Sequence, residues 1–269
     1  MAESNPNATG GTPGITLALS GGAARSIAHI GVLKVLVAGG IPIRGIAGTS
    51  GGALIGILFA SGYPIADLEQ DAHGLEWRRL AELRPHPLGI LSTRKLADFL
   101  ERRIGRLQFA DLRIPCAVVT TNLTLGEKQV FDRGPVNPVV EASCAVPEFY
   151  RPVELDGQAY VDGGVVEPLP VESACALCGR PVVAVSVLQR RSHDGGPRRA
   201  WHLVGQICET VQLELVRRSA PAADLFVEPE LGAYPYFALE NAPGLIAAGE
   251  AAMLGQLDRL KRLLDSTNR

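Results

Sequence analysis

The chain has 269 residues, of which 46% are hydrophobic and 20% are charged, and 26 basic and 28 acidic side chains give a net charge of −2. This composition excludes intrinsic disorder for the bulk of the chain. The balanced charge also argues against a dedicated nucleic-acid-binding protein, which is usually basic.

The N-terminal part of the chain predicts a tail and two strand–helix units. Residues 1–13 are rich in Ser, Asn, Gly and Pro, which is typical of a disordered tail. Apolar runs predict strands at residues 15–19 and 43–47, and helices follow them at residues 23–39 and 51–61. A strand–helix–strand–helix order favours a parallel sheet covered by helices.

The rest of the chain also predicts a mixture of strands and helices, without an internal repeat or an interdomain linker. Residues 64–107 are expected to be mainly helical and interrupted near Pro85, Pro87 and Gly89, with Ser92 capping the helix that runs through Arg103. Strands are expected at residues 114–122, 129–132, 181–187 and 225–227, and a strand pair at 153–162; helices are expected at 136–144, 171–178, 201–218 and 245–264. A polar, arginine-rich loop separates two of these elements at residues 189–199. We therefore expect one α/β domain over residues 14–269.

Cysteine usage and the N-terminus both favour a cytoplasmic protein. The five cysteines are odd in number and lie in apolar segments, which is typical of reduced thiols. The polar start of the chain lacks the features of a signal peptide. The longest apolar stretch, residues 51–60, is too short to span a bilayer.

A nucleophile motif lies between the second predicted strand and the helix after it. Residues 48–52, GTSGG, match the pattern G-x-S-x-G, which in this context predicts a sharp turn that exposes Ser50. The flanking Gly48 and Gly52 allow such a turn. The helix N-terminus favours developing negative charge beside the hydroxyl. The alternative is a Gly/Ser-rich turn in which Ser50 merely caps the helix.

A glycine-containing turn precedes the first helix. In SGGAARS, residues 20–26, successive backbone amides can converge on an anion. The turn is neither a P-loop, because no Lys-Ser or Lys-Thr pair follows, nor a dinucleotide-binding loop, because Ala23 and Ser26 replace glycines. Close to a nucleophile motif it favours an oxyanion hole; the alternative is a tight turn without function.

A carboxylate follows the predicted strand pair at residues 153–162. In YVDGG, Asp162 stands before two glycines at a tight turn. An Asp-Gly turn is common and often has no catalytic role. Asp162 therefore matters only if the fold brings it to Ser50.

Four stretches give the chain a family resemblance: LALSGGAARSIAHIGVLKVL, IAGTSGGALIGILFASG, ASCAVPEFYRPV and YVDGGVVEPLPV. With these motifs in this order, the chain resembles the small bacterial type of patatin-like phospholipase. The resemblance implies a three-layer α/β/α sandwich with a mostly parallel central sheet. It also implies a Ser-Asp dyad in place of a triad, with no metal and no cofactor. The site residues it implies are Ser50 as nucleophile, Asp162 as base, the backbone of Gly21, Gly22 and Ala23 as oxyanion hole, and Arg25, Gly48, Gly52 and Gly163 in support.

The activity implied is hydrolysis of a phospholipid, lysophospholipid or other fatty-acyl ester through an acyl-enzyme. A lipid ester is the expected partner, peripheral membrane contact and oligomeric state stay open, and no nucleic acid is expected. Ala23 and Ser26 depart from the glycines usual in the family loop. Two alternatives stay open: a Ser-His-Asp hydrolase, and a non-catalytic lipid-binding or regulatory protein that keeps the fold.

Three further features are expected to be structural. His29 lies one helical turn after Arg25 and is interpreted as a support rather than a base. Cys175 and Cys178 have CxxC spacing, but zinc needs a second ligand pair, so core packing is expected. The arginines of the polar loop are expected to be solvated, with contact to anionic lipid headgroups as the alternative: Arg190, Arg191, Arg198 and Arg199.

Overall fold

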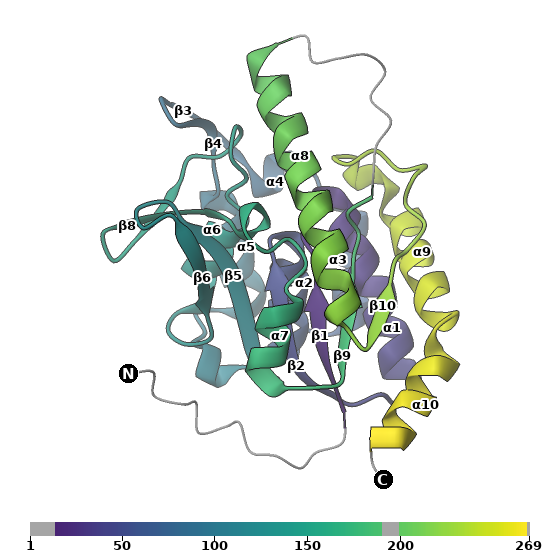
Figure 1. Ribbon diagram of the computed structural model, residues 1–269. Coiled ribbons are helices and arrows are strands. Elements are labelled where there is room, and N and C mark those ends of the chain that lie inside the picture. Colours follow the sequence, from purple (N-terminus) through teal and green to yellow (C-terminus); the bar gives the residue numbers. More distant parts are fainter. Residues whose placement is uncertain (1–13, 190–198, 268–269) are drawn as a thin grey trace.

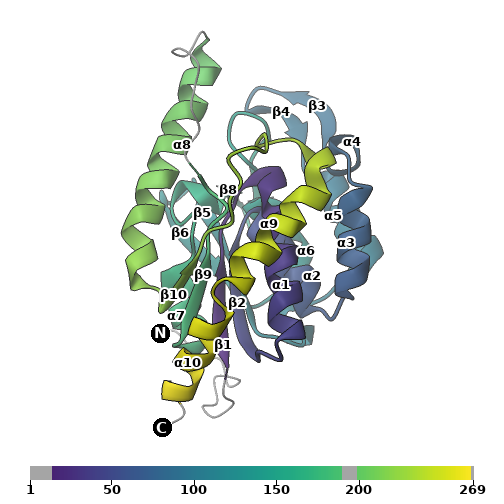
Figure 2. The ribbon, with the colours of Figure 1, turned by 90° about the vertical axis from the view of Figure 1, so that its right-hand side faces the viewer.

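The computed structural model describes residues 14–189 and 199–267. A central sheet lies between two layers of helices, with α7 and α8 on one side and α1, α2 and α9 on the other (Figures 1 and 2). The predicted tail at residues 1–13 and most of the arginine-rich loop lie outside the described residues. The single-domain organisation over residues 14–269 stays a prediction.

The sheet has eight strands and is mostly parallel. The strand order is β10-β9-β1-β2-β5-β8-β7, and β6 pairs with β5 off this path. Strands β10, β9, β1, β2 and β5 run parallel to their neighbours, whereas β6, β7 and β8 are antiparallel. The bounds are β1 Ile15–Leu19, β2 Ile43–Thr49, β5 Cys116–Asn122, β6 Glu127–Phe131, β7 Val153–Leu155, β8 Gln158–Asp162, β9 Val182–Val185 and β10 Leu225–Val227. The three-layer α/β/α fold predicted from the sequence is therefore confirmed.

Helices lie between most of the strands along the chain. The α-helices around the sheet are α1 Ala28–Ala38, α2 Gly51–Ala60, α3 Ile65–His73, α4 Trp77–Leu80, α5 Arg94–Ile104, α6 Val136–Ser143, α7 Val171–Cys178, α8 Ala200–Ser219, α9 Ala242–Leu254 and α10 Leu257–Thr267. Within the described residues, five short 3₁₀ helices accompany them: η1 Ala23–Ile27, η2 Phe109–Asp111, η3 Gly163–Val165, η4 Ala220–Ala222 and η5 Leu239–Asn241. Among the described helices, none combines the length and apolar character needed to cross a bilayer.

Both faces of the sheet are buried, and they differ in side-chain size. Along β1, Leu17 and Leu19 belong to the larger hydrophobic cluster, and Ala18 between them belongs to the smaller one, which includes residues of α7 and α8. Alternate residues of a strand point to opposite faces. On the α7 side, alanines stand in direct register across four neighbouring strands: Ala184, Ala18, Ala47 and Ala117. This row of small side chains lets α7 pack close to the sheet.

The structure differs from the expected helices in two places. Within residues 64–107, β3 (Glu82–His86) and β4 (Gly89–Ser92) form a separate two-stranded hairpin. Pro85 lacks an amide donor, which disfavours a helix, and Gly89 lies so close to Arg151 that a Cβ would approach its backbone nitrogen to 2.4 Å. The final helix also divides into α9 and α10, after Leu254.

The predicted cap of α5 is shifted by one residue. The helix begins at Arg94, with Thr93 in the capping position. The hydroxyl of Ser92 accepts a hydrogen bond from the Arg94 amide at 3.3 Å. Ser92 therefore supports the first turn from just outside it.

Helices α1 and α9 touch through their backbones. A Cβ on Gly31 would lie 2.0 Å from the carbonyl oxygen of Ile246, and one on Gly249 would lie 1.9 Å from that of Ala28. Beside this contact, the Lys34 ammonium lies 2.9 Å from Glu69 and 2.5 Å from Glu250. The approach of the two helices therefore requires glycine at both positions.

We expect Gly31→Ala to lower the free energy of unfolding by about 2 kcal/mol, because overpacking a close contact typically costs about 1–3 kcal/mol. Urea denaturation followed by circular dichroism measures this. Gly255→Ala is the control, since its Cβ would have no neighbour nearer than 3.6 Å. Equal stability of Gly31→Ala and the natural chain would contradict the close helix contact.

Candidate active site

Ser50 occupies a strained turn between β2 and α2. Its φ of 54° and ψ of −125° are rarely adopted by a residue with a side chain. A Cβ on Gly48 would lie 2.5 Å from the Cα of Ala53, and one on Gly52 would lie 2.3 Å from the carbonyl oxygen of Leu19. The expected glycines are thus required on both sides of Ser50, at the carboxyl end of β2.

A second serine, Ser143, holds this turn in place. The amide of Ser50 donates to the Ser143 hydroxyl at 2.8 Å. That hydroxyl donates in turn to the carbonyl oxygen of Val119 at 2.7 Å. Ser143 therefore ties the turn to α6 and β5. It lies within the stretch ASCAVPEFYRPV, in which no local pattern marks it for this role.

Strand β5 brings Asp162 to Ser50. Val119 of β5 pairs with Thr49, and the next residue, Thr120, pairs with Asp162. Both positions pair with β6 on the opposite edge of β5. The end of β8 therefore lies next to the end of β2 along one edge of β5. This brings Asp162 to Ser50, as a role for Asp162 requires.

Asp162 is a buried carboxyl, only 5% exposed. Its Oδ1 accepts a hydrogen bond from the Gly164 amide at 2.7 Å. Burial raises the pKa of Asp162 to about 6, while hydrogen bonds from the Ser50 hydroxyl and the Gly164 amide act in the opposite direction. Gly163 is required beside it, because a Cβ there would lie 2.3 Å from the carbonyl oxygen of Val119.

The loop before η1 offers two amides to the same cavity. The Gly21 amide is engaged, because it donates to the carbonyl oxygen of Pro168 at 3.1 Å. The amides of Gly22 and Ala23 have no acceptor among the described residues, and both residues line a cavity with Ser50. Of the three residues expected to form an oxyanion hole, these two have a free donor. Ala23 also has a φ of 48°, in the region that favours glycine.

Arg25 is buried, 3% exposed, and fastens two distant segments. Its guanidinium donates to the carbonyl oxygen of Tyr234 at 2.9 and 3.2 Å, and to that of Gln189 at 3.5 Å. It also lies over the ring of Tyr236, 5.9 Å from the centroid. Tyr236 lines the cavity around Ser50, so Arg25 holds a wall of that cavity.

His29 supports the loop before η1 through a buried hydrogen bond. Its Nε2 lies 2.9 Å from the carbonyl oxygen of Ser20, and the ring is fully buried. Desolvation lowers the pKa of His29 to about 4, against the opposing effect of that hydrogen bond. A neutral ring therefore donates from Nε2 to Ser20, which agrees with the interpretation of His29 as a support.

Two cavities meet at Ser50. One, of about 390 Å³, has a polar wall to which α8 contributes Gln206, Glu209 and Gln212, and it includes Asp162. The other, of about 610 Å³, is mainly apolar. Its wall includes Leu54, Ile55, Leu75, Trp77, Leu80, Leu83, Leu91, Leu96 and Leu239. Ser50, Ala23, Val146, Phe149 and Phe237 line both cavities.

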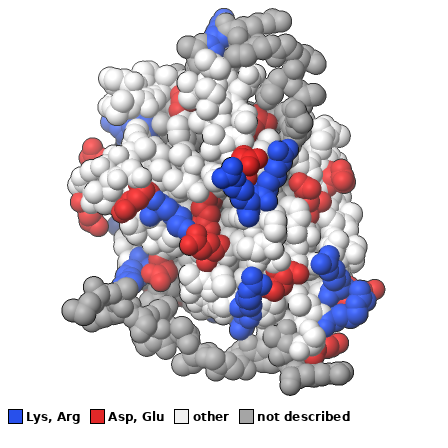
Figure 3. Space-filling model, in the orientation of Figure 1, with Lys and Arg blue, Asp and Glu red and all other residues white. Residues whose placement is uncertain are grey.

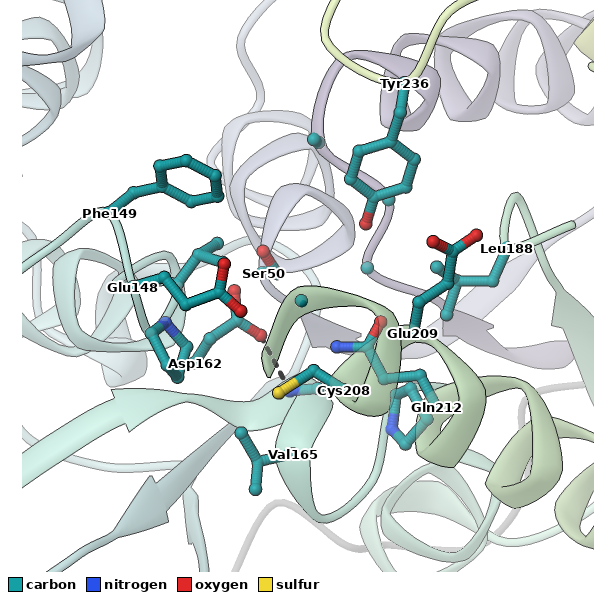
Figure 4. Close-up of a pocket in the computed structure, with 18 of the residues that line it drawn as sticks. Ser50, Glu148, Phe149, Asp162, Val165, Leu188, Cys208, Glu209, Gln212 and Tyr236 are labelled. Atoms are coloured by element: carbon teal, nitrogen blue, oxygen red, sulfur yellow. Dashed lines mark hydrogen bonds between the residues drawn. The ribbon is translucent and has the colours of Figure 1, made fainter. Parts of the chain in front are cut away.

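Several cavity residues were not anticipated from the sequence. Figure 4 shows Glu148 and Phe149 on one side of Ser50, and Glu209 and Gln212 on the other. Phe237 packs edge-on against three other rings between the two cavities, with centroids 5.0 to 5.9 Å apart: Trp77, Phe149 and Tyr236. Glu148 and Phe149 lie in a family stretch, whereas the other segments carry no motif that marks them.

The CxxC pair is only partly packed. Cys178 is half-buried, and its thiol lies 3.4 Å from the carbonyl oxygen of Arg44. Cys175 is exposed, so the expectation of core packing is wrong for it, because the last turns of α7 present that side to solvent.

Across residues 14–189 and 199–267, three or more His, Cys, Asp or Glu side chains are nowhere grouped to hold a metal ion. Arg199 is exposed, and the other three arginines of the loop lie outside the described residues.

Comparisons with known proteins agree with this fold and these motifs. A family model described as patatin-like phospholipase matches residues 17–175, more than half of the chain. A protein named as an uncharacterized NTE family protein of Mycobacterium tuberculosis is 35% identical over 194 residues, which cover 70% of this chain and 52% of the relative. Patatin-like phospholipase domain-containing protein 6 of Homo sapiens is 33% identical over 210 residues, 73% of this chain and 15% of the relative.

The chain thus spans about half the length of the mycobacterial relative. Among solved structures, VipD from Legionella pneumophila superposes with a TM-score of 0.63, over 92% of this chain and 67% of that one. The two sequences are 15% identical, so this likeness concerns the fold.

We expect Ala23→Gly to raise the free energy of unfolding by about 1 kcal/mol, because a left-handed conformation costs an L-residue about 1–2 kcal/mol, partly offset by the entropy of glycine in the unfolded chain. Thermal and urea denaturation measure the change. Ala24→Gly is the control: Ala24 is buried at an ordinary φ, so this change should destabilise the protein. A loss of stability in Ala23→Gly would show that position 23 is not strained.

Proposed function

Because the chain belongs to the patatin-like phospholipase family, we propose that it hydrolyses lipid esters through an acyl-enzyme on Ser50. The observation that carries the proposal is the pairing of Ser50, in a strained turn, with the buried carboxylate of Asp162. A serine hydroxyl is a weak nucleophile and needs a partner that takes its proton. Asp162 is proposed as that partner.

The two cavities support a lipid ester as substrate. A fatty-acyl chain fits the apolar cavity of about 610 Å³, since burial of its methylene groups is favourable there. The alcohol part of the ester would occupy the polar cavity, beside Glu209 and Gln212 of α8. An ester bond at the junction of the two cavities lies against Ser50, which lines both.

In the acylation step, Ser50 Oγ bonds to the ester carbonyl carbon, and the hydroxyl proton passes to the Asp162 carboxylate. The carbonyl oxygen becomes an oxyanion that accepts hydrogen bonds from the amides of Gly22 and Ala23. The bond between the carbonyl carbon and the alcohol oxygen then breaks. The alcohol leaves with the proton held by Asp162, and the acyl group stays on Ser50.

In the deacylation step, Asp162 takes a proton from water while the water oxygen bonds to the acyl carbon. The bond to Ser50 Oγ breaks, Ser50 regains the proton, and a fatty acid leaves. A pKa of about 6 suits both steps, because the carboxylate is ionised at neutral pH yet more basic than an exposed aspartate.

Ser50→Ala is expected to lose most turnover of a soluble p-nitrophenyl ester, since removal of a comparable nucleophile costs about 10⁶-fold. A fluorophosphonate should label the natural chain at Ser50 and fail to label this variant. Ser61→Ala is the control, because Ser61 lines neither cavity and its hydroxyl bonds within its own helix end. Near-normal turnover in Ser50→Ala, or no labelling of the natural chain, would leave the non-catalytic alternative.

Asp162→Asn keeps the shape of the side chain and removes its basicity, so we expect a folded protein with almost no activity. In the natural chain, kcat/KM should rise with pH around about 6, as Asp162 loses its proton, and level off above neutral pH. His29→Asn should retain substantial activity, because the His29 ring bonds to Ser20 and not to Ser50. The opposite ranking of these two variants would require a histidine-based mechanism.

Stability provides an independent check on the folded state of Asp162→Asn. The raised pKa means that folding favours the protonated carboxyl, so its contribution to stability is present below pH 4 and is lost as pH rises through about 6. The variant should therefore melt no lower than the natural chain at pH 7.5. A large drop in melting temperature would make its inactivity uninformative.

A further inference from the structure

The β3–β4 hairpin projects from the end of the molecule at which the cavities lie (Figures 1 and 2). Its apolar side chains are unusually exposed: Leu83 is 73%, Leu88 66% and Ile90 52% accessible. Leu88 lies in the turn between the two strands. A hairpin of two strands gains little stability on its own in water, so its exposed apolar side chains indicate a binding role.

Strand β4 of the hairpin is held by backbone hydrogen bonds to residues 149 and 151. The amides of Ile90 and Leu91 both donate to the carbonyl oxygen of Phe149, at 3.1 and 2.8 Å. The amide of Arg151 donates to the carbonyl oxygen of Leu91 at 3.1 Å. Phe149 lines both cavities, so the hairpin is anchored directly to the wall of the candidate site.

The hairpin also continues the apolar cavity outward. Leu83 and Leu91 line that cavity, whereas Leu88 and Ile90 do not. The apolar lining therefore extends from Ser50 to the exposed side chain of Leu83 on the hairpin, which gives a path to the surface. Such a path would let an acyl chain pass from an apolar medium to the nucleophile without crossing water.

Basic side chains are concentrated in the hairpin and in the helices on either side of it in the chain. Residues 78–103 contain seven basic and three acidic side chains, in a chain whose net charge is −2. Arg79, Arg84 and Arg94 are exposed and form no ion pair with any described residue. Figure 3 shows an uncharged projection at the upper left, where the hairpin lies, with Lys or Arg atoms at its lower edge.

A second exposed apolar surface, on α8, is not connected to the apolar cavity. Helix α8 presents Leu203, Val204, Ile207 and Val211 on one face. At about 100° per residue, that face points away from Gln206, Glu209 and Gln212, which line the polar cavity. Among the side chains of α8 that the structure describes, none lines the apolar cavity. The hairpin is therefore the better candidate for contact with lipid.

We propose that the β3–β4 hairpin docks the protein on an anionic lipid bilayer, with Leu88 and Ile90 inserted among the acyl chains and Arg79, Arg84 and Arg94 against lipid phosphates. Apolar anchors combined with basic side chains are the features that bind a protein to such a surface. A protein interface, in contrast, has a core depleted of charge. The use of this docking for catalysis rests on the proposed function, but the docking itself does not.

The test measures binding to vesicles of ether-linked phosphatidylcholine and phosphatidylserine in equal amounts, because ether lipids have no ester to hydrolyse. The natural chain should co-sediment with these vesicles and bind far less to phosphatidylcholine alone or at high salt. The double variant Leu88→Ser, Ile90→Ser should bind at least tenfold more weakly. Arg84→Gln should lose roughly fivefold on the anionic vesicles only.

The matched control is the double variant Val37→Ser, Leu254→Ser. These side chains are 51% and 59% exposed and lie near the ends of α1 and α9, toward α10 and away from the hairpin (Figure 2). This variant should bind vesicles as the natural chain does. Neither double variant should alter hydrolysis of a soluble p-nitrophenyl ester, since Leu88 and Ile90 lie outside both cavities.

The outcomes separate the two proposals. Equal vesicle binding by the hairpin variant and the natural chain would overturn the docking proposal and leave the hydrolase intact. No vesicle binding at all, with the hairpin found instead to bind another protein, would also overturn it. Vesicle binding that depends on Leu88 and Ile90, in a chain that hydrolyses no ester, would support docking and reject the hydrolase.

Discussion

The register of a single strand, β5, sets the geometry on which the candidate site depends. Because β6 occupies one edge of β5, strands β2 and β8 share the other edge and meet between Val119 and Thr120. A shift of either strand by one residue would break its hydrogen bonds and turn its side chains to the wrong face. Ser50 and Asp162 are therefore brought together by backbone pairing, and side chains such as Ser143 only refine their positions.

Most of the buried polar groups around this junction hold backbone segments rather than face the cavities. His29 bonds to Ser20, and Arg25 bonds to Tyr234 and Gln189. A neutral ring suits the first role, since a buried cation without a carboxylate partner would be costly. Asp162 differs, because the burial that raises its pKa also makes it a better proton acceptor. The candidate site thus combines a strained serine with a desolvated carboxyl, and both features cost stability.

The sequence predicts the local features of the candidate site well, but it does not predict which distant segments form the walls of the two cavities. The Ser50 turn, the glycines beside it and the mostly parallel sheet follow from short-range rules about backbone space and periodicity. The β3–β4 hairpin was missed because its residues alternate weakly and its pairing depends on contact with residues 149–151. Engagement of the Gly21 amide by Pro168, and the contribution of Glu209 and Tyr236 to the cavity, join segments far apart in the chain. No local pattern encodes such contacts.

The two cavities at Ser50 are built from different parts of the chain. The apolar one draws mainly on residues 54–96, whereas α8, from the other helical layer, contributes only to the polar one. Changes in the cavity-facing residues of α8 can therefore alter the polar cavity and leave the wall of the apolar cavity untouched. The shapes of the two cavities can therefore change largely independently of each other, by substitutions confined to one segment of the chain.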